Sequence, residues 1–280
     1  MLAPARPPPG GPAPEATMFF LRGRRRRRLL ATPLTEAERR LLLAKAPLCA
    51  ALPAALQPRH EGVLQVLLAE KHFEGADGLT VDEPMRLAIL GQAALLQLRA
   101  AADYYPGLET ILVYPEAFVV SEPEMDEYGI VHEGPDERAG ESWGRGVVVL
   151  SWADARRESR RRDGYNLVLH EFAHQLDDQT GEADGTPYLS TPALAARWRE
   201  AFQAAFERHA KLLRLRREVL FDRDAAESPT EFFATAVELF FELPQELRQS
   251  YPEVYAVLAE YLELDPAGWA PPQRSARGPR

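Results

Sequence analysis

Residues 167–177, LVLHEFAHQLD, place His170, Glu171 and His174 within an otherwise apolar run. In a helix, residues i and i+4 lie one turn apart on the same face, so the two imidazole rings reach a common point. Zinc accepts neutral imidazole nitrogens in a tetrahedral site and, in catalytic sites, keeps one position for water. Glu171 projects from the neighbouring edge of this face, where it can take a proton from that water. The pattern predicts His170 and His174 as zinc ligands and Glu171 as general base.

The structural alternative is a helix-packing seam in which hydrogen bonds satisfy both histidines. The bare H-E-x-x-H pattern occurs by chance in on the order of one in a hundred chains of this length. The neighbouring Phe172, Ala173 and Leu176 are uncharged, so they would shield a catalytic water. Two buried and unpaired imidazoles would destabilise the helix through their desolvation. A metal that binds both rings is the simpler explanation.

A third ligand is expected from a carboxylate, because no histidine follows His174 until His209. The candidates are the acidic residues Asp177, Asp178, Glu227, Glu231 and Glu238. Ser228-Pro229-Thr230-Glu231 also fits a capping box, in which the Glu231 carboxylate bonds back to the Ser228 amide. Spacing alone leaves Glu231 open as a ligand or as a cap. The remaining histidines have polar neighbours in sequence and are expected at the surface: His60, His72, His132 and His209.

Composition indicates a globular protein, with 46% hydrophobic residues and a net charge of −9. The negative charge argues against a nucleic-acid binder, because phosphate affinity needs a basic face. The local exception is Arg22 and the run Arg24 to Arg28, directly after Met18-Phe19-Phe20-Leu21. We interpret this run as a solvated arm; the alternative is a contact to RNA or to an anionic membrane.

Cysteine content and hydropathy restrict the compartment. Cys49 is the only cysteine, which excludes an intramolecular disulfide and a cysteine-based zinc ribbon. The N-terminal apolar residues precede the charges, which is the reverse of a secretory signal. No window approaches about 18 uninterrupted apolar residues, so no transmembrane helix is expected. These features predict a cytoplasmic protein.

The chain divides into one domain with extensions at both ends. Residues 1–17 are too rich in Pro, Gly and Ala to pack, so we expect a disordered extension, and Met18 is an equally suitable start. Residues 18–32 are the basic arm and 33–264 a single domain. Residues 265–280 are again rich in Pro, Gly and Arg, which predicts a disordered tail.

Hydrophobic spacing predicts an α+β architecture. A capping box from Thr35 to Glu38 predicts one helix, with Thr32 as a rival N-cap. Further helices are expected at 59–72, 82–103, 163–178, 192–213, 229–242 and 250–262. Residues typical of strands occur at 110–114, 117–120 and 146–152. We expect a short mixed sheet packed on the helix of residues 167–177, with 147–150 as an edge strand along which substrate could add.

Four blocks of the sequence, in order, resemble the Mlc titration factor A family of zinc peptidases. They are YPGLETILVYPEAF, GESWGRGVVVLSWADARR, NLVLHEFAHQLDDQTGEADGTPYL and SPTEFFATAVELFF, and the resemblance covers most of residues 18–262. It implies a zincin-like fold with a metalloprotease core similar to that of anthrax lethal factor. It also implies one zinc ion per chain, with His170, His174 and Glu231 as ligands and Glu171 as general base.

The resemblance further implies an aminopeptidase that hydrolyses short peptides through a zinc-activated water and binds a transcriptional repressor of the Mlc type. Family members commonly carry a tyrosine seven residues before the ligand glutamate, where this chain has Asp224. An ionised carboxylate cannot donate a hydrogen bond to an oxyanion. This departure supports a second hypothesis, a catalytically weak or inactive module that sequesters a transcription regulator.

Overall fold

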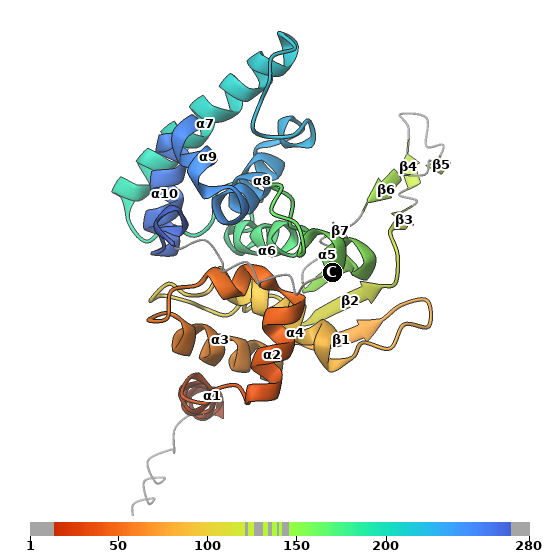
Figure 1. Cartoon of the computed structure of the whole chain (residues 1–280), viewed down its shortest axis with the longest axis vertical. Helices are drawn as coiled ribbons and strands as arrows, with labels where there is room; N and C mark the ends of the chain where they lie inside the picture. Colours follow the sequence, from red (N-terminus) through yellow and green to blue (C-terminus); the bar gives the residue numbers. More distant parts are fainter. Residues whose placement is uncertain are drawn as a thin grey trace, which may run out of the picture.

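The computed structural model describes residues 14–120, 123–125, 131–133, 136–138, 140–141 and 146–269. Within these ranges, helices surround a short sheet (Figure 1). The helix with the histidine pair, α6 (Leu167–Asp177), lies at the centre and contacts helices from both the first and the last part of the chain. The predicted α+β architecture is confirmed.

The N-terminal part consists mainly of helices. They are α1 (Pro14–Leu30), α2 (Glu36–Lys45), the 3-10 helix η1 (Pro47–Ala51), α3 (Gln57–Glu70) and α4 (Glu83–Leu95). α2 begins with a capping box, in which the Thr35 hydroxyl accepts from the Glu38 amide at 3.2 Å and the Glu38 carboxylate accepts from the Thr35 amide at 2.6 Å. Thr35 is therefore the N-cap, and the rival start at Thr32 is wrong.

α4 ends earlier than its apolar spacing predicts. The spacing predicts a helix to residue 103, whereas α4 ends at Leu95. The buried Gln97 side chain accepts from the Tyr104 amide at 3.0 Å and closes the following turn. Tyr104 and Tyr105 have positive φ angles of 64° and 53°, a backbone region outside the right-handed helix. The turn after α4 is thus stabilised by a side-chain contact that apolar periodicity does not report.

The sheet has four strands in the order β1-β2-β8-β7. Its strands are β1 (His72–Gly75), β2 (Thr110–Tyr114), β8 (Val147–Ser151) and β7 (Gly140–Glu141). β1, β2 and β8 are parallel, and β7 runs antiparallel to β8, so the sheet is mixed as predicted. Two separate ladders pair β3 (Phe118–Val120) with β6 (Asp136–Arg138) and β4 (Pro123–Met125) with β5 (Val131–Glu133).

β8 is not the edge strand that the sequence predicts. It pairs with β2 on one side, and β7 pairs with Val149 and Leu150 on the other. The outer side of β8 is therefore already paired at Val149 and Leu150. Residues 147–150 as a whole are therefore not the free edge strand that the predicted substrate addition requires.

The C-terminal part supplies the helices around α6. They are α5 (Trp152–Glu158), the 3-10 helix η2 (Asp178–Thr180), α7 (Pro192–Arg214), η3 (Asp224–Ala226), α8 (Pro229–Glu242), α9 (Pro244–Ser250), α10 (Pro252–Leu262) and η4 (Pro266–Gly268). α6 begins later than residue 163, because Asn166 is its N-cap and accepts from the Leu169 amide at 3.1 Å. Gly164, with a φ of 103°, makes the bend before it.

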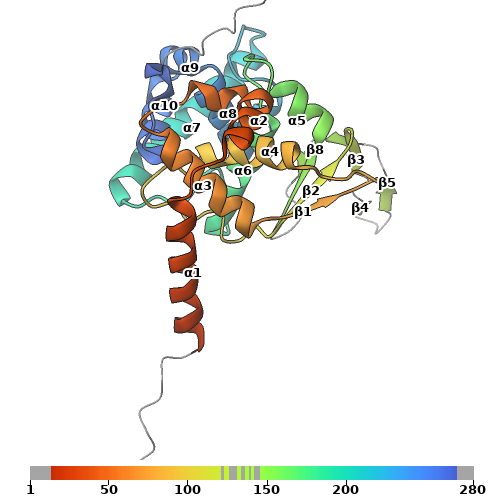
Figure 2. The same ribbon diagram turned by 60° about the horizontal axis from the view of Figure 1, so that its bottom comes forward.

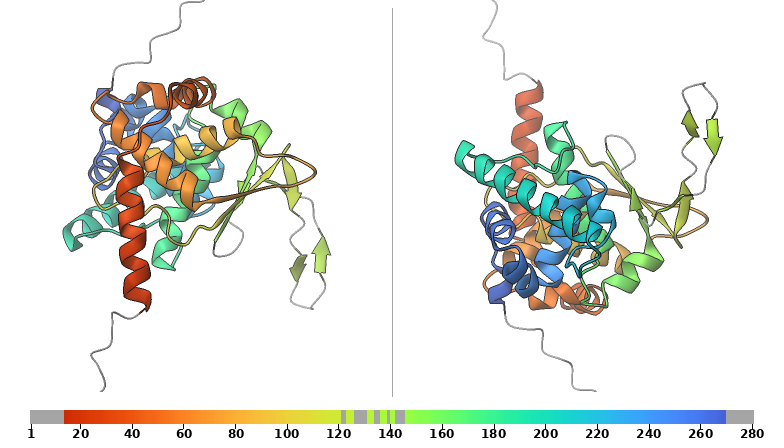
Figure 3. Two further views of the ribbon diagram at one scale, coloured as in Figure 1. Left: turned by 90° about the horizontal axis from the view of Figure 1, so that it is seen from below. Right: turned by 90° about the horizontal axis from the view of Figure 1, so that it is seen from above.

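Both ends of the chain are more ordered than the sequence predicts. The basic segment is not merely a solvated arm, because α1 is helical and Arg22 and Arg26 bind Glu70 of α3, although the helix also projects from the body of the molecule (Figures 2 and 3). Near the other end, the Tyr255 hydroxyl donates to Asp265 at 2.5 Å and accepts from the Ala267 amide at 2.9 Å. The remaining parts of the predicted extensions, residues 1–13 and 270–280, lie outside the described residues.

The core lies where α6, α8 and α7 pack together. Phe172 of α6 and Phe233 of α8 are fully buried, and Trp198 of α7 stacks on Phe202 at 4.5 Å between ring centroids. These apolar faces hold α8 against α6, and α6 also contacts β8. Among the described helices, none combines the length and apolar character that crossing a bilayer requires.

Candidate metal centre

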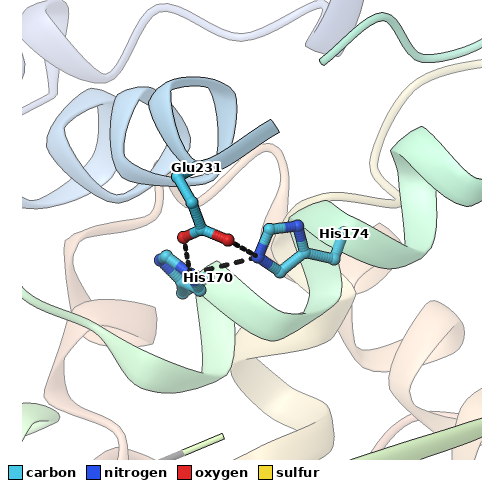
Figure 4. Close-up of side chains that lie close together, drawn as sticks. All are labelled: His170, His174 and Glu231. Carbon is cyan, nitrogen blue, oxygen red and sulfur yellow. Dashed lines mark hydrogen bonds and ion pairs between the residues drawn. The ribbon is translucent and has the colours of Figure 1, made fainter. Parts of the chain in front are cut away.

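Three side chains meet where the first turn of α8 crosses α6 (Figure 4). His170 and His174 lie one turn apart on α6, and their Nε2 atoms are 3.1 Å from each other. Glu231 of α8 places Oε2 3.1 Å from His170 Nε2 and Oε1 3.5 Å from His174 Nε2. The structure thus brings the three predicted ligands together at one point.

The spacing of these atoms fits a tetrahedral metal ion. Ligand atoms bound 2.0–2.1 Å from a tetrahedral zinc lie roughly 3.3 Å from one another. The three distances of 3.1, 3.1 and 3.5 Å lie around this value. Two imidazoles and one carboxylate are also the protein ligands of one class of catalytic zinc site, which leaves a fourth position for water. The residues therefore fit a catalytic zinc ion.

Glu231 takes part in the N-cap of α8 only through its backbone amide, without the predicted bond from its carboxylate to the Ser228 amide. Ser228 is the N-cap of α8, and its hydroxyl accepts from the Glu231 amide at 3.1 Å. Pro229 occupies the first turn, where a missing amide hydrogen costs nothing. The carboxylate of Glu231 faces the histidines. The backbone of Glu231 is thus part of the cap, while its side chain belongs to the candidate metal site.

Glu238 holds the far side of the His170 ring. Its Oε1 lies 2.8 Å from His170 Nδ1, and its Oε2 accepts from the Asn166 amide. The carboxylate is almost completely buried. Such a partner fixes the ring orientation and the tautomer, so that Nε2 is directed to the metal position. The sequence suggests Glu238 as a ligand, whereas the structure places it behind a ligand.

Asn166 extends this contact into a buried polar network. Its side-chain amide donates to Gln92 of α4 at 2.8 Å and to Glu242 of α8 at 2.9 Å. Arg162 lies 3.6 Å from the second Glu242 oxygen. Burial raises the pKa of Glu242 to about 7, although the bond from Asn166 and the charge of Arg162 oppose this effect. The network connects α4, α6 and α8 behind the centre.

Sequence analysis misses this network because its members are far apart in the chain. Glu238 and Glu242 are four residues apart, which puts both on one face of α8. Both are acidic residues among phenylalanines, and a buried carboxylate requires a partner. That signal identifies the face, but it does not identify Asn166 or Gln92 as the partners.

The electrostatics of the two histidines differ. Burial lowers the pKa of His170, but the hydrogen bonds to Glu231 and Glu238 outweigh burial and hold that pKa well above its usual value. Burial and the neighbouring charge of His170 lower the pKa of His174 to about 4. Metal ligation requires both rings as neutral imidazoles. Binding of an ion therefore displaces a proton from His170.

Glu171 lies in the middle of α6 and is only 3% exposed. Its negative charge contributes to the raised pKa of His170, so the carboxylate lies within electrostatic range of the centre. Burial keeps bulk water away from a carboxylate that must exchange protons with a bound reactant. These features suit a general base, the role that the sequence predicts for Glu171.

The loop after α6 positions the beginning of α8. Asp177 accepts from the Gly185 and Thr186 amides, each at 2.8 Å, so it has a structural role in place of the predicted candidate ligand role. Thr230 of α8 donates to Ala183 in the loop at 2.8 Å. A Cβ atom at Gly185 would lie 2.5 Å from the Pro229 carbonyl oxygen. This close approach sets the position of the turn that carries Glu231.

A cavity of about 540 Å³ opens at the C-terminal end of α6. Its wall includes Asp103 and Tyr188 together with Gln175, Asp178 and Gln179. Asp178 is four residues after His174 and therefore continues the face that carries the two histidines. The cavity thus lies at the end of the helix that carries the two histidines and offers space for a ligand, although none of the three candidate metal ligands lines it.

The other histidines do not all follow the prediction. His72 is exposed, as predicted, and the side chain of His132 lies outside the described residues. His60 is buried instead, with Nε2 2.7 Å from the Gly91 carbonyl oxygen of α4. His209 is also buried, against the ring of Phe221 at a centroid distance of 5.6 Å. Contacts between helices bury both rings, although their sequence neighbours are polar.

Comparison with known proteins identifies the family of this chain. The sequence model of the family "glucose-regulated metallo-peptidase M90" matches residues 20–263. The chain is 37% identical to Mlc titration factor A of Edwardsiella ictaluri, over 79% of this chain and 85% of the relative. It is 34% identical to Mlc titration factor A of Serratia proteamaculans, over 79% and 84%. It is also 35% identical to "Uncharacterized protein slr2042" of Synechocystis, over 86% and 89%.

These matches confirm the predicted family and its zincin-like fold. The matched residues include α6, the loop that follows it and the whole of α8, so the family region contains the complete candidate centre. A family of metallopeptidases also implies a metal ion, which the histidine and glutamate group is suited to hold. This chain, with its candidate metal ligands on two crossing helices, therefore belongs to the M90 family of metallopeptidases.

Proposed function

We propose that this protein is a zinc-dependent peptidase in which His170, His174 and Glu231 hold the ion. The observation that carries the proposal is the convergence of two imidazole nitrogens and one carboxylate at 3.1 to 3.5 Å in a chain of the M90 family. Zinc is the metal that this donor set favours when one position is kept for a reactant. Glu171 is the general base.

A zinc ion at this centre would polarise a peptide carbonyl and make a water molecule more acidic. Glu171 accepts a proton from the attacking water and passes it to the nitrogen of the leaving amine. Glu238 keeps the His170 ring in the orientation that directs Nε2 to the ion. The buried position of Glu171 limits proton exchange with bulk water.

The cavity beside α6 is the proposed peptide cleft. Its lining includes Gln175, the residue after His174, and Asp103 and Asp178 place carboxylates on its wall. The amino terminus of a peptide is positively charged near neutral pH, so these carboxylates would attract it. Anchoring of the amino terminus near the metal selects the first peptide bond for hydrolysis. This arrangement supports aminopeptidase activity on short peptides.

The names of the relatives support a regulatory partner. Several are called Mlc titration factor A, which suggests a transcriptional repressor of the Mlc type as a partner of this chain. The second candidate function is a binding module that sequesters such a regulator with little or no hydrolysis. Asp224 favours this candidate, because an ionised carboxylate in η3, just before α8, cannot donate a hydrogen bond to an oxyanion.

Zinc content and hydrolysis of short peptides, measured on the same preparations, test the proposal. We expect about one zinc per chain in the wild type and its loss in Glu231→Ala. Glu227→Ala is the matched control, because Glu227 lies one turn before Glu231 and is exposed. It should keep the metal. Glu171→Gln should keep zinc but lose hydrolysis by a factor of about 100 or more.

Three outcomes would contradict parts of this proposal. A wild-type protein without metal after zinc is supplied would exclude the metal centre. Unchanged hydrolysis by Glu171→Gln would exclude Glu171 as the base. A zinc-loaded wild type without hydrolysis, which still binds a repressor of the Mlc type, would establish the binding module in place of the peptidase.

A further inference from the structure

α1 concentrates positive charge in a chain that is acidic as a whole. Arginine occupies six of the seven positions from Arg22 to Arg28, whereas the net charge of the chain is −9. The helix extends from the body and contacts it mainly through α3 (Figures 2 and 3). A projecting basic helix presents its charge to large partners without steric hindrance from the body.

One face of α1 is fixed to the protein. Arg22 and Arg26 donate to the Glu70 carboxylate, at 2.9 and 2.7 Å, and the Arg26 guanidinium lies 4.6 Å from the centre of the Tyr104 ring. Burial opposes ionisation of Glu70, but its bonds to the two arginines outweigh burial and lower its pKa to about 2. Glu70 therefore keeps its charge, and these arginines are occupied in positioning the helix.

The end of α1 packs closely against α3. A Cβ atom at Gly62 would lie 2.3 Å from the Leu30 carbonyl oxygen, so only glycine permits this approach. Together with the Glu70 contacts, this packing fixes the direction in which α1 leaves the body. The helix is thus held at its C-terminal half.

The opposite face of α1 carries exposed arginines. Arg24, Arg27 and Arg28 are exposed. They lie three and four residues apart, so they share one face of the helix. Arg22 and Arg26, which bind Glu70, lie on the other side. The three exposed guanidinium groups form a cationic face that points away from α3, and we call it the outer arginine face.

An apolar residue adjoins this charge. Leu21 is 58% exposed at the same end of α1, and the sequence before it is Met18-Phe19-Phe20. Nucleic acid would use only the arginines, whereas a phospholipid surface uses both phosphate contacts and apolar insertion. The pairing of a basic run with exposed apolar surface therefore favours a bilayer over RNA.

We propose that α1 docks this protein onto a membrane surface rich in anionic phospholipids, through the outer arginine face and Leu21. The acidic body is repelled by such a surface, so the charges orient the molecule with α1 toward the lipid. None of the residues of the candidate metal centre lies on α1 or on α3. Docking in this orientation leaves the centre free to act.

Cosedimentation of the full-length protein with vesicles tests this proposal. The vesicles contain equimolar phosphatidylglycerol and phosphatidylcholine, with pure phosphatidylcholine as the neutral comparison. We expect binding to the anionic vesicles alone, and weaker binding as the salt concentration rises. Each basic side chain near an anionic surface contributes roughly fivefold to affinity. The variant Arg24→Gln/Arg27→Gln/Arg28→Gln should therefore bind on the order of a hundredfold more weakly.

A matched control removes the same charge elsewhere. Arg214, Arg216 and Arg217 at the end of α7 are exposed and adjoin Leu215, which is 60% exposed. Their triple substitution by Gln should change vesicle binding only about twofold, through net charge. Because Arg22 and Arg26 are unchanged in the α1 variant, α1 should stay docked, and circular dichroism of both variants verifies the fold.

Several results would overturn the proposal. They are absence of wild-type binding to anionic vesicles at low salt, equal binding to neutral vesicles, or equal losses in the two triple variants. Leu21→Ser separates lipid from nucleic acid, because it should weaken vesicle binding several-fold through lost apolar burial. If the wild type binds duplex RNA more tightly than vesicles and Leu21→Ser has no effect on either, α1 is a nucleic-acid element.

Discussion

His170 uses its two ring nitrogens for different partners. Nδ1 faces Glu238 at 2.8 Å, while Nε2 faces Glu231 at 3.1 Å and His174. An ionised carboxylate only accepts hydrogen bonds, so Glu238 keeps the proton on Nδ1 and leaves Nε2 available to a metal. The orientation of the ring is therefore set before an ion arrives, and binding of the ion requires only that the proton on Nε2 leaves.

Substitution of Glu238 tests this role. Glu238→Gln removes the charge and retains the size of the side chain, so we expect zinc affinity to fall about 10- to 100-fold. Competition with a chromophoric chelator at fixed pH measures the affinity, and Glu227→Gln is the control at an exposed position of the same charge. Equal zinc affinity in the two variants would show that Glu238 does not position His170.

The centre could be predicted only in part from the sequence. The spacing of His170, Glu171 and His174 predicts the pair and its base, because the period of a helix converts spacing into a shared face. The role of Glu231 stays ambiguous in the sequence, since a cap and a ligand both require a glutamate in the first turn. Both roles need the carboxylate, and only three-dimensional placement shows that the carboxylate faces the histidines while the Glu231 amide bonds the Ser228 hydroxyl.

At the scale of elements, the loop between η2 and α7 controls the position of Glu231, a candidate metal ligand. Asp177 binds two loop amides, and Gly185 in that loop approaches the first residue of α8. Gly185 has a φ of 80°, where side chains are disfavoured. The start of α8, and with it Glu231, therefore depends on a residue without a side chain.

Gly185→Ala should therefore lower both stability and zinc affinity. The positive φ costs about 1–2 kcal/mol for alanine, and the clash with the Pro229 oxygen displaces the start of α8. Gly78→Ala is the matched control, because Gly78 has a φ of 79° and no atom lies near its added Cβ. Chemical denaturation and zinc titration of both variants are the measurements. A zinc affinity lowered equally in both would contradict this account.

Element boundaries show which contacts a sequence pattern omits. The periodicity of 192–213 and 229–242 predicts α7 and α8 almost residue for residue, because their apolar faces are long and regular. The sequence pattern does not predict that α1 is a helix held against the protein, because Glu70, which binds Arg26, is 44 positions away. Composition alone predicts that a basic run is solvated. Here the Glu70 carboxylate, which is distant in sequence, binds part of that run.

At the scale of the molecule, the network of Asn166, Gln92 and Glu242 joins the two halves of the helical part. It links α4 on one side of α6 to α8 on the other. Burial raises the pKa of Glu242 from its usual value to about 7. The folded protein thus binds the Glu242 proton more tightly than the unfolded chain does.

Stability should therefore depend on pH through Glu242. The stabilisation that comes from its bound proton is complete below the pKa of the unfolded chain, near 4.5. It is lost as pH rises through the pKa of the folded protein, about 7. Glu242→Gln imitates the protonated form and keeps the oxygen that accepts from Asn166. We expect the variant to gain stability relative to the wild type between pH 5 and about 8. Urea denaturation at pH 5 and at about pH 8 measures the difference in free energy of unfolding between the variant and the wild type. The same difference at both pH values would contradict the prediction.

The crossing of α6 and α8 has a consequence for the long stretch between them. His174 and Glu231 bracket η2, the loop that contains Gly185, and all of α7. An ion held by both residues closes this stretch into a ring, and such closure restricts the unfolded chain as a covalent cross-link does. Zinc would therefore act as a reversible cross-link. The availability of the metal in the cell would determine how long this part of the chain resists unfolding.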